Sequence, residues 1–274
     1  MDQAIAGLSA GICSTLVMHP LDLAKVQMQA SSNRKGISLI HVLQNNIKYT
    51  GSIRSLYHGL GVNMLGSAVS WGTYFYVYGF TKSLFLGTTS SEPVPITAMQ
   101  TLISSAFAGC IVAAFTNPMW VVKSRILSRT VNYSNPFYGV YHLLKNEGVR
   151  GCYAGFTPSL LGVSQGALQF MAYEKLKIWH KGQPSNLDYL FMSAASKVFA
   201  AMNMYPLLVV RTRLQVFQPG ISMLEMFKKI WRVEGPLAFY KGFQPHLLRV
   251  IPQTCITFLV YEQVGLHFKS RASL

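Results

Sequence analysis

The chain has 274 residues, of which 50% are hydrophobic and only 12% are charged, and its mean hydropathy is +0.28. Since a soluble domain carries roughly 25% charged residues, this composition argues against a soluble protein and favours a membrane protein. The net charge of +15 is also compatible with a basic helical module that binds nucleic acid, but such a module does not need apolar segments throughout its length.

Six apolar segments are expected to form membrane-spanning helices. None of them is an uninterrupted apolar run of about eighteen residues, so each helix should carry one polar face. Polar faces inside a membrane bundle line a water-filled cavity, because lipid cannot satisfy their hydrogen bonds. In chain order, the helices are expected at residues 4–30, 58–86, 97–127, 155–180, 187–215 and 243–268.

The basic residues are unevenly distributed over these segments. Of the 24 Lys and Arg residues, 16 lie in the segments that lead to the second, fourth and sixth helices, counted from Lys25, Lys123 and Arg211 onward, and six lie at the opposite helix ends. The positive-inside rule therefore predicts that both termini lie on the less basic side of the membrane. The remaining two, Lys197 and Arg249, fall inside helices.

A short motif occurs three times: a proline, a base five residues later, and a second polar residue two positions after the base. A second motif, aromatic-x-Gly, follows each proline by about thirty residues and shares the same period, which indicates three repeats of about ninety residues. The first motif is Pro20–Gln27, Pro118–Arg125 and Pro206–Arg213, and the second is Tyr57–Gly59, Tyr153–Gly155 and Tyr240–Gly242.

Between the two motifs of each repeat lies a polar, basic segment with a short amphipathic stretch. Such stretches are typical of helices that lie at a membrane surface, and the alternative is a disordered loop. The stretches cover residues 37–47, 140–145 and 223–231.

The two motifs, each repeated three times, resemble those of the mitochondrial carrier family over essentially the whole chain. The resemblance implies an all-α membrane protein with six transmembrane helices in three pseudosymmetric repeats, each with a short matrix-side surface helix. The repeats would span residues 1–90, 91–182 and 183–274. The resemblance also implies a monomer in the mitochondrial inner membrane, with both termini facing the intermembrane space. Such a protein imports or exchanges a small anionic metabolite by alternating access.

Within the family, three stretches resemble the FAD and folate carriers most: Ser70–Phe75, Ser164–Glu174 and Arg249–Phe258. FAD is therefore the expected substrate, with folate, NAD and pyrimidine nucleotides as alternatives. A membrane-embedded enzyme is the competing class, but the sequence has no His/Asp/Glu cluster, phosphate-binding loop or nucleophile–base pair that supports it. No resident cofactor or metal is expected. The aromatic-x-Gly turns should open helices whose free N–H groups bind cardiolipin.

The resemblance also implies a matrix gate at the first motif, where the acid of one odd-numbered helix pairs with the base of the next. Asp22 should then form an ion pair with Lys123. Trp120 can offer Arg211 at most a cation–π contact, and Lys25 has no acid opposite it. The prolines that should kink these helices are Pro20, Pro118 and Pro206.

A cytosolic gate is expected at the other end of the bundle, on the even-numbered helices. The resemblance implies two ion pairs there, Lys82–Glu174 and Lys177–Glu262.

Lys197 and Arg249 are expected to bind the anionic part of the substrate, because a charge buried in a membrane rarely persists without a function. By resemblance, Arg249 lies at the level of the family's substrate contacts, where Gly66 and Gly162 occupy the corresponding positions of the other repeats and leave room for a bulky ligand. The residues expected to contact its rings are Trp71, Tyr74 and Gln169.

Overall fold

The computed structural model describes residues 2–32, 37–86, 98–131, 133, 135–180, 186–217 and 220–249. In this part of the chain, all regular secondary structure is helical. The α-helices are α1 (Asp2–Ala30), α2 (Leu39–Thr50), α3 (Leu60–Leu86), α4 (Ala98–Leu127), α5 (Pro136–Cys152), α6 (Phe156–Trp179), α7 (Asn186–Phe217) and α8 (Met223–Val233), and the short 3-10 helices are η1 (Ile53–Tyr57) and η2 (Pro236–Tyr240). Residues 243–249 are helical as well.

The five long helices α1, α3, α4, α6 and α7 begin and end within about three residues of the predicted spans. They contain 24 to 32 residues, so at a rise of 1.5 Å per residue they are roughly 36 to 48 Å long, enough to cross a bilayer core of about 30 Å. The part of the sixth predicted helix beyond residue 249 lies outside the described residues. The three amphipathic stretches also form helices, α2, α5 and α8, which confirms the helical alternative for them.

By length and composition, two described segments are apolar enough to cross a membrane, Ile103–Leu127 and Phe191–Phe217. The other long helices carry polar residues that face inward. In α1, these include His19, Asp22 and Lys25, all of which are buried.

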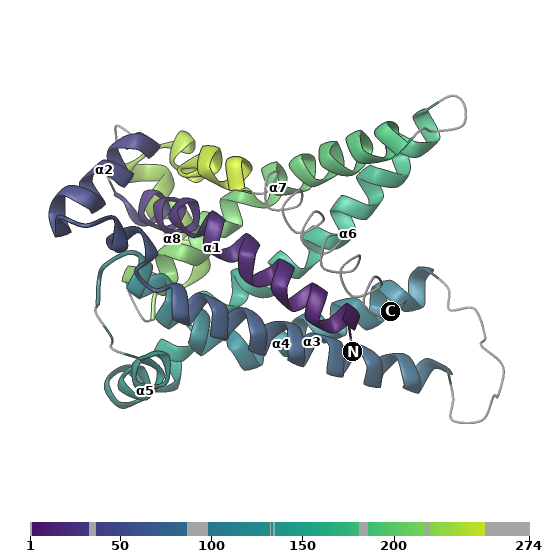
Figure 1. Ribbon diagram of the computed structural model, residues 1–274, viewed down its shortest axis with the longest axis horizontal. Helices are drawn as coiled ribbons and strands as arrows, with labels where there is room; N and C mark the ends of the chain where they lie inside the picture. Colours follow the sequence, from purple (N-terminus) through teal and green to yellow (C-terminus); the bar gives the residue numbers. More distant parts are fainter. Residues whose placement is uncertain are drawn as a thin grey trace, which may run out of the picture.

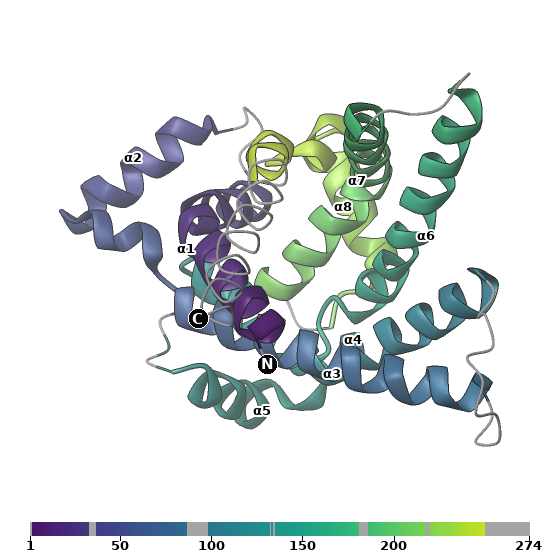
Figure 2. The ribbon, with the colours of Figure 1, turned by 45° about the vertical axis from the view of Figure 1, so that its right-hand side comes forward.

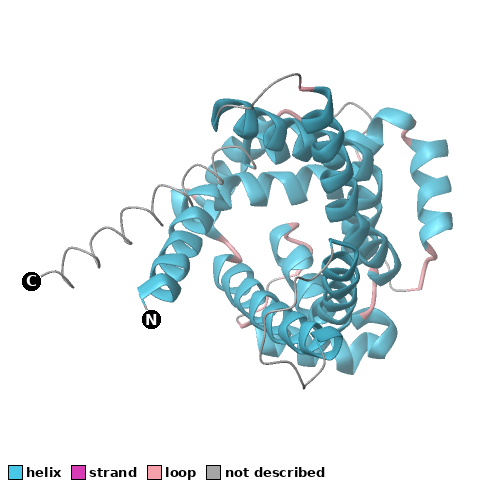
Figure 3. Ribbon diagram, turned by 90° about the vertical axis from the view of Figure 1, so that its right-hand side faces the viewer, coloured by secondary structure: helices cyan, strands magenta, loops and turns pink. Residues whose placement is uncertain are grey.

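The long helices form a ring, which is seen along its axis in Figure 3. Helices α2, α5 and α8 gather at one end, which we call the closed end, and the C-terminal ends of α3 and α6 lie at the other, the open end (Figure 1). Helix α3 runs beside α4, and α6 beside α7, and the two pairs diverge toward the open end (Figure 2).

The residue before each motif proline ties the first motif to the second. In every repeat, its side chain hydrogen-bonds the carbonyl of the middle residue of the aromatic-x-Gly turn, although the three side chains differ in type. The contacts are His19 Nε2 with His58 O at 3.1 Å, Asn117 Nδ2 with Ala154 O at 3.4 Å, and Tyr205 OH with Lys241 O at 3.1 Å. These bonds explain why the two motifs share one period.

The second polar residue of each motif joins neighbouring repeats. Each of these side chains donates to a main-chain carbonyl on the next of the three helices that carry the motif proline, α1, α4 and α7. The acceptor lies nine residues after that proline, so the three bonds close a ring. They are Gln27 Nε2 to Leu127 O at 3.0 Å, Arg125 Nε to Gln215 O at 2.9 Å, and Arg213 Nε to Gln29 O at 3.0 Å. The ring holds α1, α4 and α7 together at the closed end.

Both arginines of this ring of hydrogen bonds also bind a half-buried acid. Arg125 forms a bidentate pair with Glu147, with N–O distances of 2.5 and 2.8 Å. Arg213 pairs in the same way with Glu234, which also binds the ammonium of Lys241. Such forked pairs add geometric specificity to the ionic attraction, so they fix α5 and the end of α8 against the bundle.

The glycines of the aromatic-x-Gly turns are packed against the neighbouring repeat. All three have positive φ, between 71° and 79°, which favours glycine. A Cβ on Gly155 would lie 2.9 Å from the carbonyl oxygen of Arg211 in α7, whereas one on Gly51 (φ 68°) would meet nothing within 4 Å. The turns therefore permit close contact between repeats.

Gly155→Ala should destabilise the protein more than Gly51→Ala. Both changes carry the left-handed backbone cost of about 1–2 kcal/mol, but only the first also forces a side chain against the backbone of α7. Thermal unfolding of the detergent-purified proteins measures the difference. Equal thermal midpoints for the two variants would contradict the packing assigned to the turn.

Glu234 makes the stability of the closed end depend on pH. Burial raises the pKa of this carboxyl, but the hydrogen bonds and charges of Arg213 and Lys241 outweigh burial and hold the pKa below 4.5. A carboxyl with a lowered pKa stabilises the fold above its unfolded-state pKa, and this contribution is lost as the pH falls through the folded-state value. The thermal midpoint of the wild type should therefore decrease below pH 4.5.

In Glu234→Gln this acid-induced decrease should be smaller, because the titrating group is gone. The variant should already be less stable at neutral pH, since Arg213 and Lys241 lose their partner. Thermal midpoints measured from pH 7 downward for both proteins provide the check, and parallel curves would contradict the role given to Glu234.

Candidate functional site

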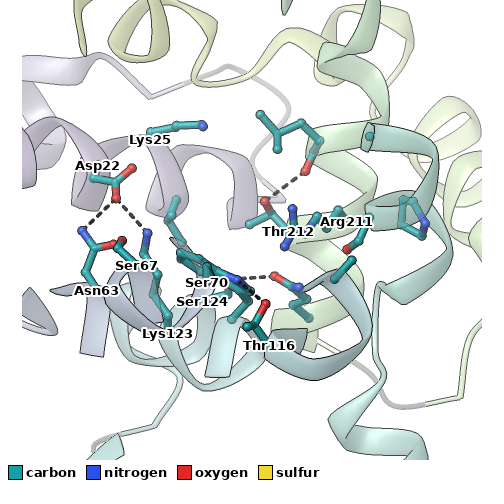
Figure 4. A pocket seen from close by; sticks show the side chains of 18 of the residues that line it. Asp22, Lys25, Asn63, Ser67, Ser70, Thr116, Lys123, Ser124, Arg211 and Thr212 are labelled. Atoms are coloured by element: carbon teal, nitrogen blue, oxygen red, sulfur yellow. Dashed lines mark hydrogen bonds and ion pairs between the residues drawn. The ribbon is translucent and has the colours of Figure 1, made fainter. Parts of the chain in front are cut away.

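A polar cavity of about 630 Å³ lies inside the helix ring, above the closed end. All five long helices contribute to its lining, together with Arg249. Its volume is within the usual range of small-molecule sites, roughly 300–1,000 Å³. Figure 4 shows the polar side chains that converge on it.

Asp22 lies at the bottom of the cavity and is 4% exposed. Its Oδ2 accepts from Lys123 Nζ at 2.9 Å and from Asn63 Nδ2 at 3.3 Å, as Figure 4 shows. The ion pair that the sequence predicts between Asp22 and Lys123 is therefore present. It joins α1 to α4, and Asn63 adds α3 to the same carboxylate.

Arg249 makes a contact that the sequence analysis missed. One of its terminal nitrogens forms an ion pair with Asp22 Oδ1 at 2.5 Å. Arg249 is predicted to bind the substrate, but in the structure it also pairs with Asp22, which therefore binds two bases rather than one. Arg249 still borders the cavity, and its Nε is buried without a hydrogen-bond partner among the described residues.

The contact expected for Trp120 is corrected by the structure. Its ring lies under the ammonium of Lys123, 4.9 Å from the ring centroid, and its Nε1 donates to Thr116 Oγ1 at 3.1 Å. The cation–π partner is therefore a residue of the same helix, three positions on and on the same face, instead of Arg211 on α7.

Lys25 and Arg211, the other two motif bases, also border the cavity. Neither forms a hydrogen bond or ion pair with any described residue, and Lys25 is only 8% exposed. We call the five charged residues at the bottom of the cavity the floor. Four bases and one acid make it strongly positive, and they are Asp22, Lys25, Lys123, Arg211 and Arg249.

Of the other residues predicted to bind substrate, Trp71 and Gly162 border this cavity. The ring of Trp71 meets Tyr74 edge-on with centroids 6.0 Å apart, so Tyr74 supports Trp71 from outside the lining. Three further candidates do not border the cavity: Gly66, Gln169 and Lys197. Gly66 packs against Trp120, which lies 3.9 Å from the position of a Cβ.

The predicted cytosolic gate remains a prediction. Glu262 and the side chain of Lys82 lie outside the described residues, Glu174 is half-buried, and Lys177 is exposed.

The structure adds uncharged polar residues that the sequence analysis did not select. Two hydroxyls donate to glutamines on another long helix. Ser124 Oγ of α4 donates to Gln215 Oε1 of α7 at 2.7 Å, and Thr212 Oγ1 of α7 donates to Gln29 Oε1 of α1 at 2.8 Å. The hydroxyl of Ser70, beside Trp71, is buried without a hydrogen-bond partner in the described part of the chain. The first two pairs have a sequence signal, because each hydroxyl lies six and each glutamine nine residues after a motif proline.

A ring of long helices, closed at one end and enclosing a charged cavity, is the architecture of a membrane transporter for a small solute. The chain belongs to the mitochondrial carrier family: the family's sequence profile, described as mitochondrial carrier protein, matches residues 1–89, 94–184 and 182–272. The three repeats inferred from the motifs are those of this family, and the chain is a transporter of that type.

Three relatives show where the chain lies within the family. It is 68% identical over 274 residues to an uncharacterized mitochondrial carrier of Schizosaccharomyces pombe, an alignment that covers 100% of this chain and 99% of the relative. It is 34% identical to the mitochondrial FAD carrier protein of Saccharomyces cerevisiae, with 96% and 95% covered. It is also 34% identical to the chloroplastic folate transporter 1 of Arabidopsis thaliana, with 96% and 94% covered.

Asp22→Asn and Lys25→Gln should change stability in opposite directions. The first leaves Lys123 and Arg249 unpaired, and breaking a buried ion pair by removing one partner costs about 3–5 kcal/mol. The second removes a buried base that makes no hydrogen bond or ion pair with a described residue and that is repelled by Arg249, Lys123 and Arg211, against an attraction to Asp22 alone. Thermal unfolding in detergent should give a lower midpoint for Asp22→Asn and an equal or higher one for Lys25→Gln. A loss of stability in both variants would contradict the charge arrangement of the floor.

Proposed function

We propose that the protein transports FAD between the cytosol and the mitochondrial matrix by alternating access. The observation that carries this proposal is the floor, where four bases and a single acid face the cavity. An excess of positive charge in a site shielded from bulk water attracts an anion and raises its local concentration. FAD supplies the matching chemistry, because its diphosphate is anionic and its two ring systems are planar.

The remaining support for FAD comes from the upper lining and from the relatives. Trp71 borders the cavity with 61% of its surface exposed, so its ring is available to stack on a planar group. The FAD carrier of Saccharomyces cerevisiae is similar over nearly the full length of both chains. Folate is the second candidate, because the folate transporter has the same identity and folate is also planar and anionic. NAD and pyrimidine nucleotides are the further alternatives within the family.

In this proposal, the closed end faces the matrix and the open end faces the intermembrane space. The basic segments, which lie between α1 and α3, between α4 and α6, and after α7, are at the closed end, as the positive-inside rule requires of the matrix side. Both termini then face the intermembrane space. The matrix gate is formed by the motif residues Asp22, Lys25, Trp120, Lys123 and Arg211. The cytosolic gate closes after substrate has entered, on α3, α6 and the predicted sixth helix.

Cardiolipin is the proposed lipid partner of the aromatic-x-Gly turns. Helix α3 begins at Leu60, directly after Gly59, so the first N–H groups of this helix are available at its turn. At the turn before α6, Phe156 N donates to Tyr153 O and Pro158 has no N–H, which leaves the N–H of Thr157 for a lipid. The transporter is proposed to act as a monomer without a resident cofactor, in exchange for a counter-substrate.

Reconstitution of the purified protein into liposomes tests the proposal. Radiolabelled FAD should be taken up unchanged, faster than folate, NAD or UTP, and unlabelled FAD inside the liposomes should accelerate uptake by exchange. The matched control is Asp22→Asn at equal protein content, which should lose most uptake because it disrupts the floor. Uptake of folate or a nucleotide in preference to FAD would identify that compound as the substrate in place of FAD. Chemical conversion of FAD would contradict a carrier function.

A further inference from the structure

We propose that Lys25 and Arg211 form a binding subsite for phosphoryl groups at the floor of the cavity. This inference rests on the proposed function, since it assigns the diphosphate of the transported nucleotide to that subsite. The ligand chemistry is that of a phosphate or diphosphate group, whether free or attached to a nucleotide.

The register of the repeats identifies these two bases as the ones that have lost their acids. Lys25, Lys123 and Arg211 each lie five residues after a motif proline. Lys123 binds Asp22, the acid of the first repeat, at 2.9 Å. The corresponding positions of the second and third repeats carry Trp120 and Leu208, which have no negative charge to offer.

The burial of Lys25 makes the missing partner physically significant. Its side chain is more than nine-tenths buried, yet it borders the cavity and has no hydrogen bond or ion pair to any described residue. A buried charge without a partner is costly. In Figure 4, no interaction line reaches Lys25, which extends from α1 toward the side of the cavity where Arg211 lies.

The described residues hold no acid that could serve these two bases. Asp22 is the one described acid on the cavity lining, and it is already bound by Lys123, Arg249 and Asn63. Two half-buried acids of the closed end are also bound, Glu147 to Arg125, and Glu234 to Arg213 and Lys241. Among the described residues the compensating negative charge is therefore missing, and an anionic ligand would supply it.

The two side chains suit a phosphoryl ligand. An arginine presents a planar fork of donors that matches two phosphate oxygens, and a lysine adds a compact positive charge with three donors. Because Lys25 belongs to α1 and Arg211 to α7, a diphosphate bound between them would join the first and third repeats. This link would lie beside the ion pair through which Asp22 joins the first and second repeats.

The test measures binding of two probes, inorganic pyrophosphate and FAD, to the detergent-purified full-length protein by isothermal titration calorimetry. The variants are Lys25→Gln and Arg211→Gln. The matched control is Lys228→Gln, which removes the same charge from an exposed position on α8, away from the cavity. Unliganded thermal midpoints are recorded in parallel, so that loss of folding is separated from loss of binding.

The proposal predicts that each cavity variant weakens both probes by about tenfold or more, which is the usual effect of losing a hydrogen bond to a charged group. The control should bind both probes as the wild type does. Binding of pyrophosphate that depends on Lys25 and Arg211, with no binding of FAD, would support the subsite and reject FAD as substrate.

Three results would overturn the subsite. One is pyrophosphate binding that is equal in the wild type and both variants, which would place the anion elsewhere. Another is the absence of any pyrophosphate and FAD binding to the wild type. The last is a loss of binding that accompanies a lowered unliganded thermal midpoint, because Lys25 and Arg211 would then be structural.

Discussion

The carboxylate of Asp22 is the interaction on which the closed end of this transporter depends. One buried side chain accepts from Lys123 on α4, Arg249 near the end of the described chain, and Asn63 on α3. All three repeats therefore meet at a single acid. A carboxylate has two oxygens and about four acceptor sites, so it can bridge several donors, and its loss leaves more than one charge without a partner.

The closed end combines a symmetric scaffold with an asymmetric set of charges. The hydrogen bonds of Gln27, Arg125 and Arg213 to main-chain carbonyls repeat with the threefold pattern of the chain. The charged floor above them does not, because two of three repeats lack the motif acid. The scaffold keeps the helices in register, and the imbalance of charge leaves bases available to a ligand. In the proposed function, closure and substrate binding therefore involve neighbouring residues of the same helices.

The sequence predicted the helices well because two motifs with one period constrain each other. The Asp22–Lys123 pair was accessible for the same reason, since both residues have fixed positions relative to a proline. The partner of Arg249 was not accessible, because Arg249 lies outside both motifs and 227 residues from Asp22 along the chain. The rotamer that turns Trp120 toward Lys123 is likewise decided by packing rather than by sequence spacing.

Equivalent roles filled by different residue types were also hidden from sequence comparison between the repeats. His19, Asn117 and Tyr205 make the same bond to the aromatic-x-Gly turn, but an imidazole, an amide and a phenol share no sequence pattern. Of the residues expected to contact the substrate rings, Trp71 borders the cavity whereas Tyr74 and Gln169 do not, and the reason is geometric. A helical repeat gives the face of a residue, whereas the depth and shape of a cavity depend on how the helices diverge.

A double-mutant cycle on Asp22 and Arg249 tests the central claim most directly. Thermal and denaturant unfolding would be measured for the wild type, Asp22→Asn, Arg249→Gln and the double variant in the same detergent. If Asp22 holds Arg249 as the structure indicates, removing Arg249 should cost much less once Asp22 is gone, with a coupling energy above about 0.5 kcal/mol. Additive effects of the two substitutions would show that the carboxylate does not hold Arg249, and would contradict the account of the closed end.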